Sequence, residues 1–375
     1  MANFPAAANP YAIRLTGATP NLSMLELALA QNPSFFTITG IGLFDAFGYA
    51  LSGGDGSDPI TDSPTFDFSL TTMVGALTAN GAKGAIANVP NITGLSHFTT
   101  VTHNPLEPSN PDFGPQIPTL NTIYGALNGI FAAYGETDRI IIFSADEASA
   151  VVIKDESLAD FSAQIAGGLL SNLPAFEAFI AQFGLPPAAA PSVAGLLGFV
   201  YGQARQATEA DLFVLPSSSV IGTINTANVG FLMSQGLSQA LAGQFSVEGI
   251  SLPLEDKWVL TPEEQQEISV ATSAYNASIS SVASGNGLAL VDLDSILQEA
   301  ASSGGFSSGG YSLTTSLVTG GLISLDGLHL TARGYALMAN SFLEAIDATY
   351  GSNFVASGNT SDMGDFGVTY SPLMQ

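Results

Sequence analysis

The sequence predicts an α/β protein in which a parallel β-sheet is flanked by helices. Residues 34–41 form a short apolar run, and residues 82–89 form a second one. Runs of this length and composition are typical of parallel strands that are buried on both faces. Residues 65–79, between the two runs, predict a helix. A strand, a helix and a further strand in this order indicate a parallel sheet with helices on its faces.

The rest of the chain continues this alternation. Further strands are expected over 139–144, 211–215 and 288–293. Further helices are expected over 23–30, 157–183, 191–207, 261–284 and 332–349. Thr261 and Thr331 are the expected N-caps of the last two helices, because a hydroxyl there can accept a bond from a free backbone N–H. We interpret residues 1–375 as one domain with a helical insertion at about 157–207, and the Gly/Ser-rich stretch 301–310 as a flexible loop.

The charge balance of the chain is strongly acidic. Its 375 residues include 32 Asp and Glu but only 7 Lys and Arg, which gives a formal net charge of −25. Nucleic acids and anionic membrane surfaces are bound through basic faces, so neither is an expected partner. The hydrophobic content of 46% is enough to bury a sizeable core.

The sequence contains no cysteine, which excludes disulfides, thiol nucleophiles and thiolate metal sites. No apolar run reaches the roughly 18 residues that a transmembrane helix needs. The first ten residues carry neither the basic region nor the apolar segment of a signal peptide. The acidic, cysteine-free composition nevertheless suits an exported protein, so a periplasmic or extracellular location is the hypothesis that we carry forward.

The residues with the clearest chemical meaning lie just before the last predicted helix. The stretch from Ser324 to Tyr335 reads Ser-Leu-Asp-Gly-Leu-His-Leu-Thr-Ala-Arg-Gly-Tyr, with Asp326 and His329 three residues apart. A serine hydrolase needs an imidazole that accepts the hydroxyl proton and a carboxylate that orients this imidazole. One turn could supply both groups. Taken alone, the pair is also compatible with a structural turn at a helix start.

Together with its surroundings, this stretch resembles the last sequence block of the GDSL/SGNH ester hydrolases. Other stretches that resemble a bacterial branch of the family are Asn9-Pro10-Tyr11 with Arg14, Asn32-Pro33-Ser34-Phe35-Phe36, Gly48-Tyr49-Ala50, Asn88-Val89-Pro90, Phe98-Thr99-Thr100, Asp155-Glu156-Ser157-Leu158-Ala159-Asp160, Val259-Leu260-Thr261-Pro262, Tyr275-Asn276-Ala277 and Gly320-Gly321. The resemblance implies a three-layer, flavodoxin-like α/β sandwich and hydrolysis of carboxylic or lipid esters by a Ser-His-Asp triad without a cofactor. In this sequence His329 matches the general base and Asp326 its orienting carboxylate.

The sequence also departs from the family pattern. The family's nucleophilic serine lies in a Gly-Asp-Ser block after the first strand, and no such block occurs in this chain. The nearest string, at residues 54–57, is Gly-Asp-Gly-Ser in a predicted loop. The block that normally reads Gly-x-Asn-Asp is represented here by Gly42, Phe44 and Asp45. A phenyl ring at position 44 cannot donate a hydrogen bond to an oxyanion, and loss of one such donor lowers the rate by roughly 10²–10³.

Two explanations of these departures remain open. The chain can be an N-terminally incomplete hydrolase that lacks the first strand or strands and the serine block. Alternatively, it can be a degenerate, non-catalytic homologue that acts as a binding or surface protein. Phe44 favours the second explanation, whereas loss of a central strand, which would expose the backbone groups of its neighbours, favours the first. In either case this chain alone is expected to be inactive.

Two further patterns point to metal binding only weakly. Residues 53–60 match a single unit of a Gly-Gly-x-Gly-x-Asp calcium repeat, but such repeats form sites only when several units stack. His97 and His103 lack an obvious third ligand. We therefore expect no metal site, and we interpret the two histidines as loop residues near the cleft beyond a strand end.

Overall fold

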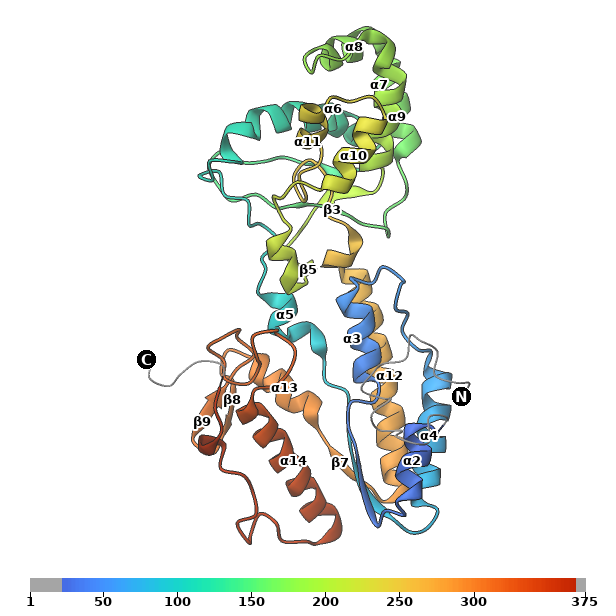
Figure 1. Ribbon diagram of the computed structural model, residues 1–375, viewed down its shortest axis with the longest axis vertical. Coiled ribbons are helices and arrows are strands. Elements are labelled where there is room, and N and C mark those ends of the chain that lie inside the picture. Colours follow the sequence, from blue (N-terminus) through green and yellow to red (C-terminus); the bar gives the residue numbers. More distant parts are fainter. Residues whose placement is uncertain (1–21, 369–375) are drawn as a thin grey trace.

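The computed structural model describes residues 22–368 and divides the chain into two lobes (Figure 1). The expected matches at residues 9–11 and at Arg14 lie outside the described residues. One lobe contains a parallel sheet and the candidate catalytic turn, and the other consists mainly of helices. Within residues 22–368, no helix combines the length and the apolarity that crossing a bilayer requires.

The sheet lobe contains the two ends of the described chain. Its elements are α2 (Met24–Ala30), β1 (Phe35–Ile38), α3 (Leu43–Leu51), α4 (Ser63–Thr78), β2 (Lys83–Ala87), α5 (Ser96–Thr99), α12 (Pro262–Asn286), β7 (Ala289–Val291), α13 (Leu293–Ala301), β8 (Phe306–Ser308), β9 (Tyr311–Leu313) and α14 (Ala332–Tyr350). A two-stranded antiparallel ladder, β5 (Leu212–Phe213) with β6 (Val259–Leu260), lies where the chain returns from the other lobe.

The parallel sheet has the strand order β1-β2-β7, which confirms the predicted α/β class and the parallel pairing of the first two strands. Helices cover both of its faces (Figure 1). On one face Phe36, Ile38 and Ile86 pack against α4 and α12. On the other face the small strand residues Ala85 and Ala289 lie under α14. The alternation of side chains along each strand explains how one short apolar run supplies both layers.

The chain segment between α5 and β6 forms the second lobe around a core of its own. Its elements are α6 (Ile117–Ala133), β3 (Val152–Lys154), α7 (Ser162–Ser171), α8 (Leu173–Ala181), α9 (Ala190–Tyr201), β4 (Ala204–Gln206), α10 (Thr226–Ser234) and α11 (Gln239–Gln244). The residues of the expected insertion, 157–207, supply α7 to α9 and β4, so the helix expected over 157–183 is two helices that meet at Asn172, and the helix expected over 191–207 ends at Tyr201 before a strand. They share this core with residues as distant as Leu106 and Val259.

Two further local predictions are wrong. No strand forms over 139–144: Arg139 ends a 3-10 helix, and side-chain amides of Asn121, Asn128 and Gln206 bond to the backbone groups of residues 141–143 that a neighbouring strand would otherwise pair. The Gly/Ser-rich stretch 301–310 is not simply a loop, because it contains β8 and the turn of the β8–β9 hairpin. Side chains from other parts of the chain decide the first case, and the geometry of the hairpin turn decides the second.

The predicted helix starts at Thr261 and Thr331 are confirmed. The Thr261 hydroxyl accepts a bond from Glu264 N–H, and the Glu264 carboxylate accepts bonds from the Thr261 backbone and hydroxyl in a complete capping box. At Thr331 the hydroxyl accepts from Gly334 N–H and donates to the carbonyl of Gly321. The Thr331 side chain therefore caps the first turn of α14, immediately after the candidate catalytic turn, and also joins it to the neighbouring loop at Gly321.

The sheet ends abruptly at β1. Among the described residues none pairs with the edge of β1 that faces away from β2. Phe35 projects from the face that α14 covers at the other two strands, and it is 39% exposed. Its ring forms a T-shaped pair with the Tyr350 ring, with the ring centroids 6.0 Å apart. Counting only residues 22–368, this strand therefore has an unpaired side and an incompletely covered face.

Candidate functional site

The turn at residues 324–329 brings the predicted carboxylate and imidazole together. The protonated Nδ1 of His329 donates to Oδ2 of Asp326 at 2.6 Å. The second carboxylate oxygen, Oδ1, accepts bonds from the Ser324 hydroxyl at 2.7 Å, from Leu328 N–H at 2.9 Å and from His329 N–H at 3.0 Å. Both oxygens of Asp326 are thus engaged, and the imidazole has one defined orientation relative to the turn.

The same contacts keep Asp326 ionised. Partial burial raises the pKa of this carboxyl, but the bonds from Leu328, Ser324 and His329 lower it by more, so that the pKa lies well below its usual range. An ionised carboxylate at Nδ1 favours the tautomer that carries its proton there. Nε2 of His329 is then an acceptor, on a side chain that is 66% exposed. The pair can therefore take a proton from a hydroxyl that approaches Nε2.

A buried histidine from another part of the chain supports this turn. Nδ1 of His97 donates to the backbone carbonyl of Asp326 at 2.9 Å, and the backbone N–H of His97 donates to the carbonyl of Gly327 at 3.1 Å. Burial lowers the pKa of His97 and favours its neutral form. Gly327 has a φ of +76°, and a Cβ added to it would lie 2.5 Å from the His97 backbone nitrogen. The turn needs glycine at this position for both reasons.

The sequence alone predicts a loop position near the cleft for His97 and does not indicate this role. The structure places it in α5, with its side chain buried against the turn. Asp326 lies 229 residues further along the chain, so no local pattern could have indicated the contact. His103 differs from His97, because its backbone carbonyl accepts a bond from Val151 N–H.

The three residues of the expected oxyanion block differ in their surroundings. Phe44 is 71% exposed and lines the same cavity as His329. Asp45 is held by the hydroxyls of Thr61 and Tyr275 and by Thr61 N–H, at 2.6 to 2.9 Å. Gly42 has a φ of +77° and packs closely against the Tyr275 ring. Of the three residues, Phe44 therefore lines the cavity that His329 also lines. Asp45 instead connects α3 to the loop before α4 through its hydrogen bonds to Thr61.

A cavity of about 440 Å³ opens beside His329. It is enclosed by the residues that follow β1, by α3, by α13 and by the start of α14. Its walls are almost entirely apolar, with Leu43, Phe47, Ile296 and Met338 among them. The described residues that line it include no carboxylate, amine or guanidinium group. His329 is the only imidazole in this lining.

No described hydroxyl completes the arrangement. Within residues 22–368 no serine, threonine or tyrosine donates a hydrogen bond to Nε2 of His329. The Gly-Asp-Gly-Ser string lies in the loop after α3, where Asp55 accepts a bond from the Ser57 backbone in a local turn. Among the described residues, the Asp326–His329 pair therefore has no hydroxyl hydrogen-bonded to Nε2.

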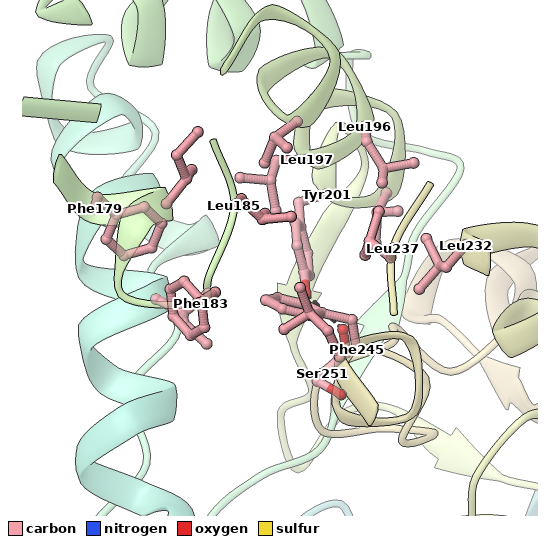
Figure 2. Close-up of a pocket in the computed structure, with 15 residues that line it drawn as sticks. Phe179, Phe183, Leu185, Leu196, Leu197, Tyr201, Leu232, Leu237, Phe245 and Ser251 are labelled. Atoms are coloured by element: carbon pink, nitrogen blue, oxygen red, sulfur yellow. Dashed lines mark hydrogen bonds between the residues drawn. The ribbon is translucent and has the colours of Figure 1, made fainter. Parts of the chain in front are cut away.

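A second cavity lies in the helical lobe and contains no comparable chemistry. Figure 2 shows side chains such as Phe179, Leu197 and Phe245 around it. Its volume is about 40 Å³, and its lining is apolar except for Tyr201 and Ser251. The Tyr201 hydroxyl is already bonded to the Ser251 carbonyl. This cavity therefore belongs to the packing of the lobe.

Comparison with protein-family models, with curated proteins and with solved structures found no match to this chain. The resemblance to the GDSL/SGNH hydrolases accordingly remains a prediction from the residues quoted above.

Proposed function

We propose that this chain carries the acid–base half of an SGNH-type serine ester hydrolase site. The observation that supports the proposal is the 2.6 Å bond between Asp326 and His329 on a rigid turn beside a large apolar cavity. Asp326 is the orienting carboxylate and His329 the general base. The substrate class is a carboxylic ester, which needs neither a metal ion nor an organic cofactor for this chemistry.

The reaction requires a hydroxyl that the described residues do not bring to His329. When a serine Oγ lies within reach of Nε2, the imidazole accepts its proton as Oγ attacks the ester carbonyl. The proton then passes to the leaving alcohol, which leaves an acyl-enzyme for water to hydrolyse. Without the nucleophile, triads of this kind lose on the order of 10⁶ in rate. We therefore expect the chain by itself to show no esterase turnover above background.

A non-catalytic role is the second candidate, and Phe44 is the observation that favours it. Its ring lies in the wall of the cavity where the resemblance expects an amide donor for the oxyanion. A protein of this kind would keep the cavity as a binding site without hydrolysing its ligand. The dyad would then be a structural turn.

Two measurements test the proposal. In ¹⁵N-resolved NMR spectra at pH 8, His329 should be protonated at Nδ1, with a strongly deshielded proton that disappears in the Asp326→Asn variant. A chain carrying Phe44→Asn and extended by a strand that ends in Gly-Asp-Ser should hydrolyse p-nitrophenyl acetate, and His329→Ala should abolish this activity. The proposal fails if His329 carries its proton at Nε2 in the unmodified chain, or if the hydrolysis is unchanged by His329→Ala.

A further inference from the structure

We propose that Asp256 is a pH-sensitive switch at the junction of the two lobes, which holds the junction closed while its side chain is protonated and opens it when the side chain ionises. The lobes are joined at a narrow waist that includes α5 and β5 (Figure 1). Asp256 begins the 3-10 helix η6 (Asp256–Trp258), which connects the helical lobe to β6. The switch does not require the proposed ester hydrolysis.

The backbone brings Asp256 next to a carboxylate of the helical lobe. Ile153 and Leu254 form a parallel bridge, and Lys154 N–H donates to the Leu254 carbonyl at 3.0 Å. The segments that follow these residues therefore continue side by side. In its protonated form the Asp256 carboxyl donates a hydrogen bond to the carboxylate of Glu156. This bond connects η6 to the end of β3.

The sheet lobe packs directly against this pair. A Cβ added to Gly53 would lie 2.2 Å from the carbonyl oxygen of Asp256, and a Cβ added to Gly54 would lie 2.7 Å from the carboxyl carbon of Glu264. The loop after α3 therefore lies against both η6 and the first turn of α12. The charge of Glu264 acts on both Asp256 and Glu156. Carboxylates from both lobes thus meet at the junction.

Two lysines near these carboxylates offset their charge only in part. Lys154 pairs with Glu156, and Lys257 pairs with Glu255. All four side chains are between 40% and 50% exposed, so water screens their charges. The junction therefore carries an excess of negative charge. The other charged or titratable groups around it are Tyr49, Asp55, Asp155, Arg205, Glu248 and Glu267.

These surroundings favour the protonated form of Asp256. Its Oδ1 is shielded from solvent, and within residues 22–368 no N–H or O–H group of a neutral or basic residue donates to it. A carboxylate that loses hydration without gaining donors is unfavourable. Burial, the bond to Glu156 and repulsion by Glu156 and Glu264 raise the pKa of Asp256 to about 8, although the positive charge of Lys154 lowers it.

The sign of the pH effect follows from the raised pKa. When the lobes separate, the Asp256 carboxyl regains water and its pKa falls toward the ordinary value of 3.8. The closed junction is then most stable at low pH and loses stability as the pH rises through about 8, where the closed form also ionises. Opening should therefore have a midpoint no higher than about pH 8.

Trp258 reports on this junction, because it is the only tryptophan of the chain and packs against the cores of both lobes. Separation of the lobes would bring its indole into contact with water and shift its emission to the red. We expect a reversible red shift between pH 6.5 and pH 9. Asp256→Asn should abolish it, since the amide stays neutral and still donates to Glu156. Glu156→Gln should reduce it at least about twofold, because it weakens the repulsion.

A distance measurement tests the opening itself. The chain has no cysteine, so spin labels can be attached through Thr71→Cys on α4 and Ala175→Cys on α8, two exposed positions in different lobes. The distance between the labels should increase from pH 6.5 to pH 9, and Asp256→Asn should prevent the increase. Asp67→Asn, at an exposed position of α4, is the matched control and should change neither signal.

A red shift and a longer label distance that both depend on Asp256 support the switch. Constant emission and distance up to pH 9 overturn it, as does an equal change in Asp256→Asn. Loss of the helical circular dichroism with the same midpoint indicates unfolding of the whole chain, which also overturns it. If Asp256→Asn does not fold, Glu156→Gln decides, and an undiminished red shift in that variant overturns the switch.

Discussion

Replacing Gly327 by alanine tests the physical basis of the Asp326–His329 turn. Gly327 adopts a φ of +76°, where an L-residue is disfavoured by about 1–2 kcal/mol. The new Cβ would also lie 2.5 Å from the backbone nitrogen of His97 and 2.7 Å from its Cα. Neither atom can move without shifting α5, and overpacking of this kind adds about 1–3 kcal/mol. We therefore expect Gly327→Ala to lower the free energy of unfolding by about 2–5 kcal/mol.

Gly358 provides a matched control. It has a φ of +71°, and a Cβ added to it would have no neighbour within 4 Å. Gly358→Ala should therefore show only the backbone penalty of about 1–2 kcal/mol. Urea unfolding monitored by circular dichroism measures both variants, and the NMR signal of the His329 Nδ1 proton reports whether the dyad survives. If Gly327→Ala is no more destabilising than Gly358→Ala, and the Nδ1 signal is unchanged, the close packing of this turn on His97 is refuted.

Three further predictions concern other parts of the molecule. Arg205 bonds to the buried carboxylates of Asp155 and Asp211 at 2.6 and 2.7 Å. Arg205→Met should therefore destabilise the helical lobe by about 3–5 kcal/mol in urea unfolding, because it leaves two buried charges unpaired. A loss of less than about 1 kcal/mol would contradict the ion-pair network. Burial raises the pKa of Glu264 from 4.5 to about 7, so the stability that its protonated form contributes is complete below pH 4.5 and lost as the pH rises through 7. The unfolding free energy should therefore fall between pH 5 and pH 8.5, and in Glu264→Gln this fall should be smaller by about 1 kcal/mol after allowance for solvent screening. A fall of the same size in both proteins would argue against this role of Glu264. Phe44→Asn alone should leave p-nitrophenyl acetate hydrolysis at background, because an oxyanion donor cannot act without a nucleophile, and saturable turnover by this variant would contradict the reading of the dyad as incomplete.

The parts of the fold that the sequence predicted well are those with local determinants. The strands over 34–41 and 82–89 were recognised because apolar runs of that length have few alternatives, and their parallel pairing followed from the helix between them. The helix after Thr261 was predicted from its capping box. The Asp326–His329 pair belongs to the same group, since its two members are three residues apart and one glycine defines the turn between them.

The parts that could not be predicted depend on distant residues. Residues 140–144 have the composition of a strand, but whether an extended segment joins a sheet depends on which partner groups lie beside it, and here they are amide side chains. The support of the Asp326 turn by His97 and the convergence of α3, α13 and α14 on one cavity are likewise products of tertiary packing. Neither has a periodicity or a short motif that a single sequence can reveal.

Within residues 22–368 one side of β1 has no strand partner, and this bears on how copies of the protein behave at high concentration. A strand edge with free N–H and C=O groups can pair with a strand from any other molecule, and the exposed Phe35 adds an apolar contact. At neutral pH the charge of −25 keeps copies apart, but this repulsion acts over only about 8 Å at physiological ionic strength. Acidification toward pH 4, where carboxylates lose their charge, removes it. Colloidal stability of the protein thus depends on its surface carboxylates, and storage at low pH or high salt should lead to edge-to-edge association that begins at this strand.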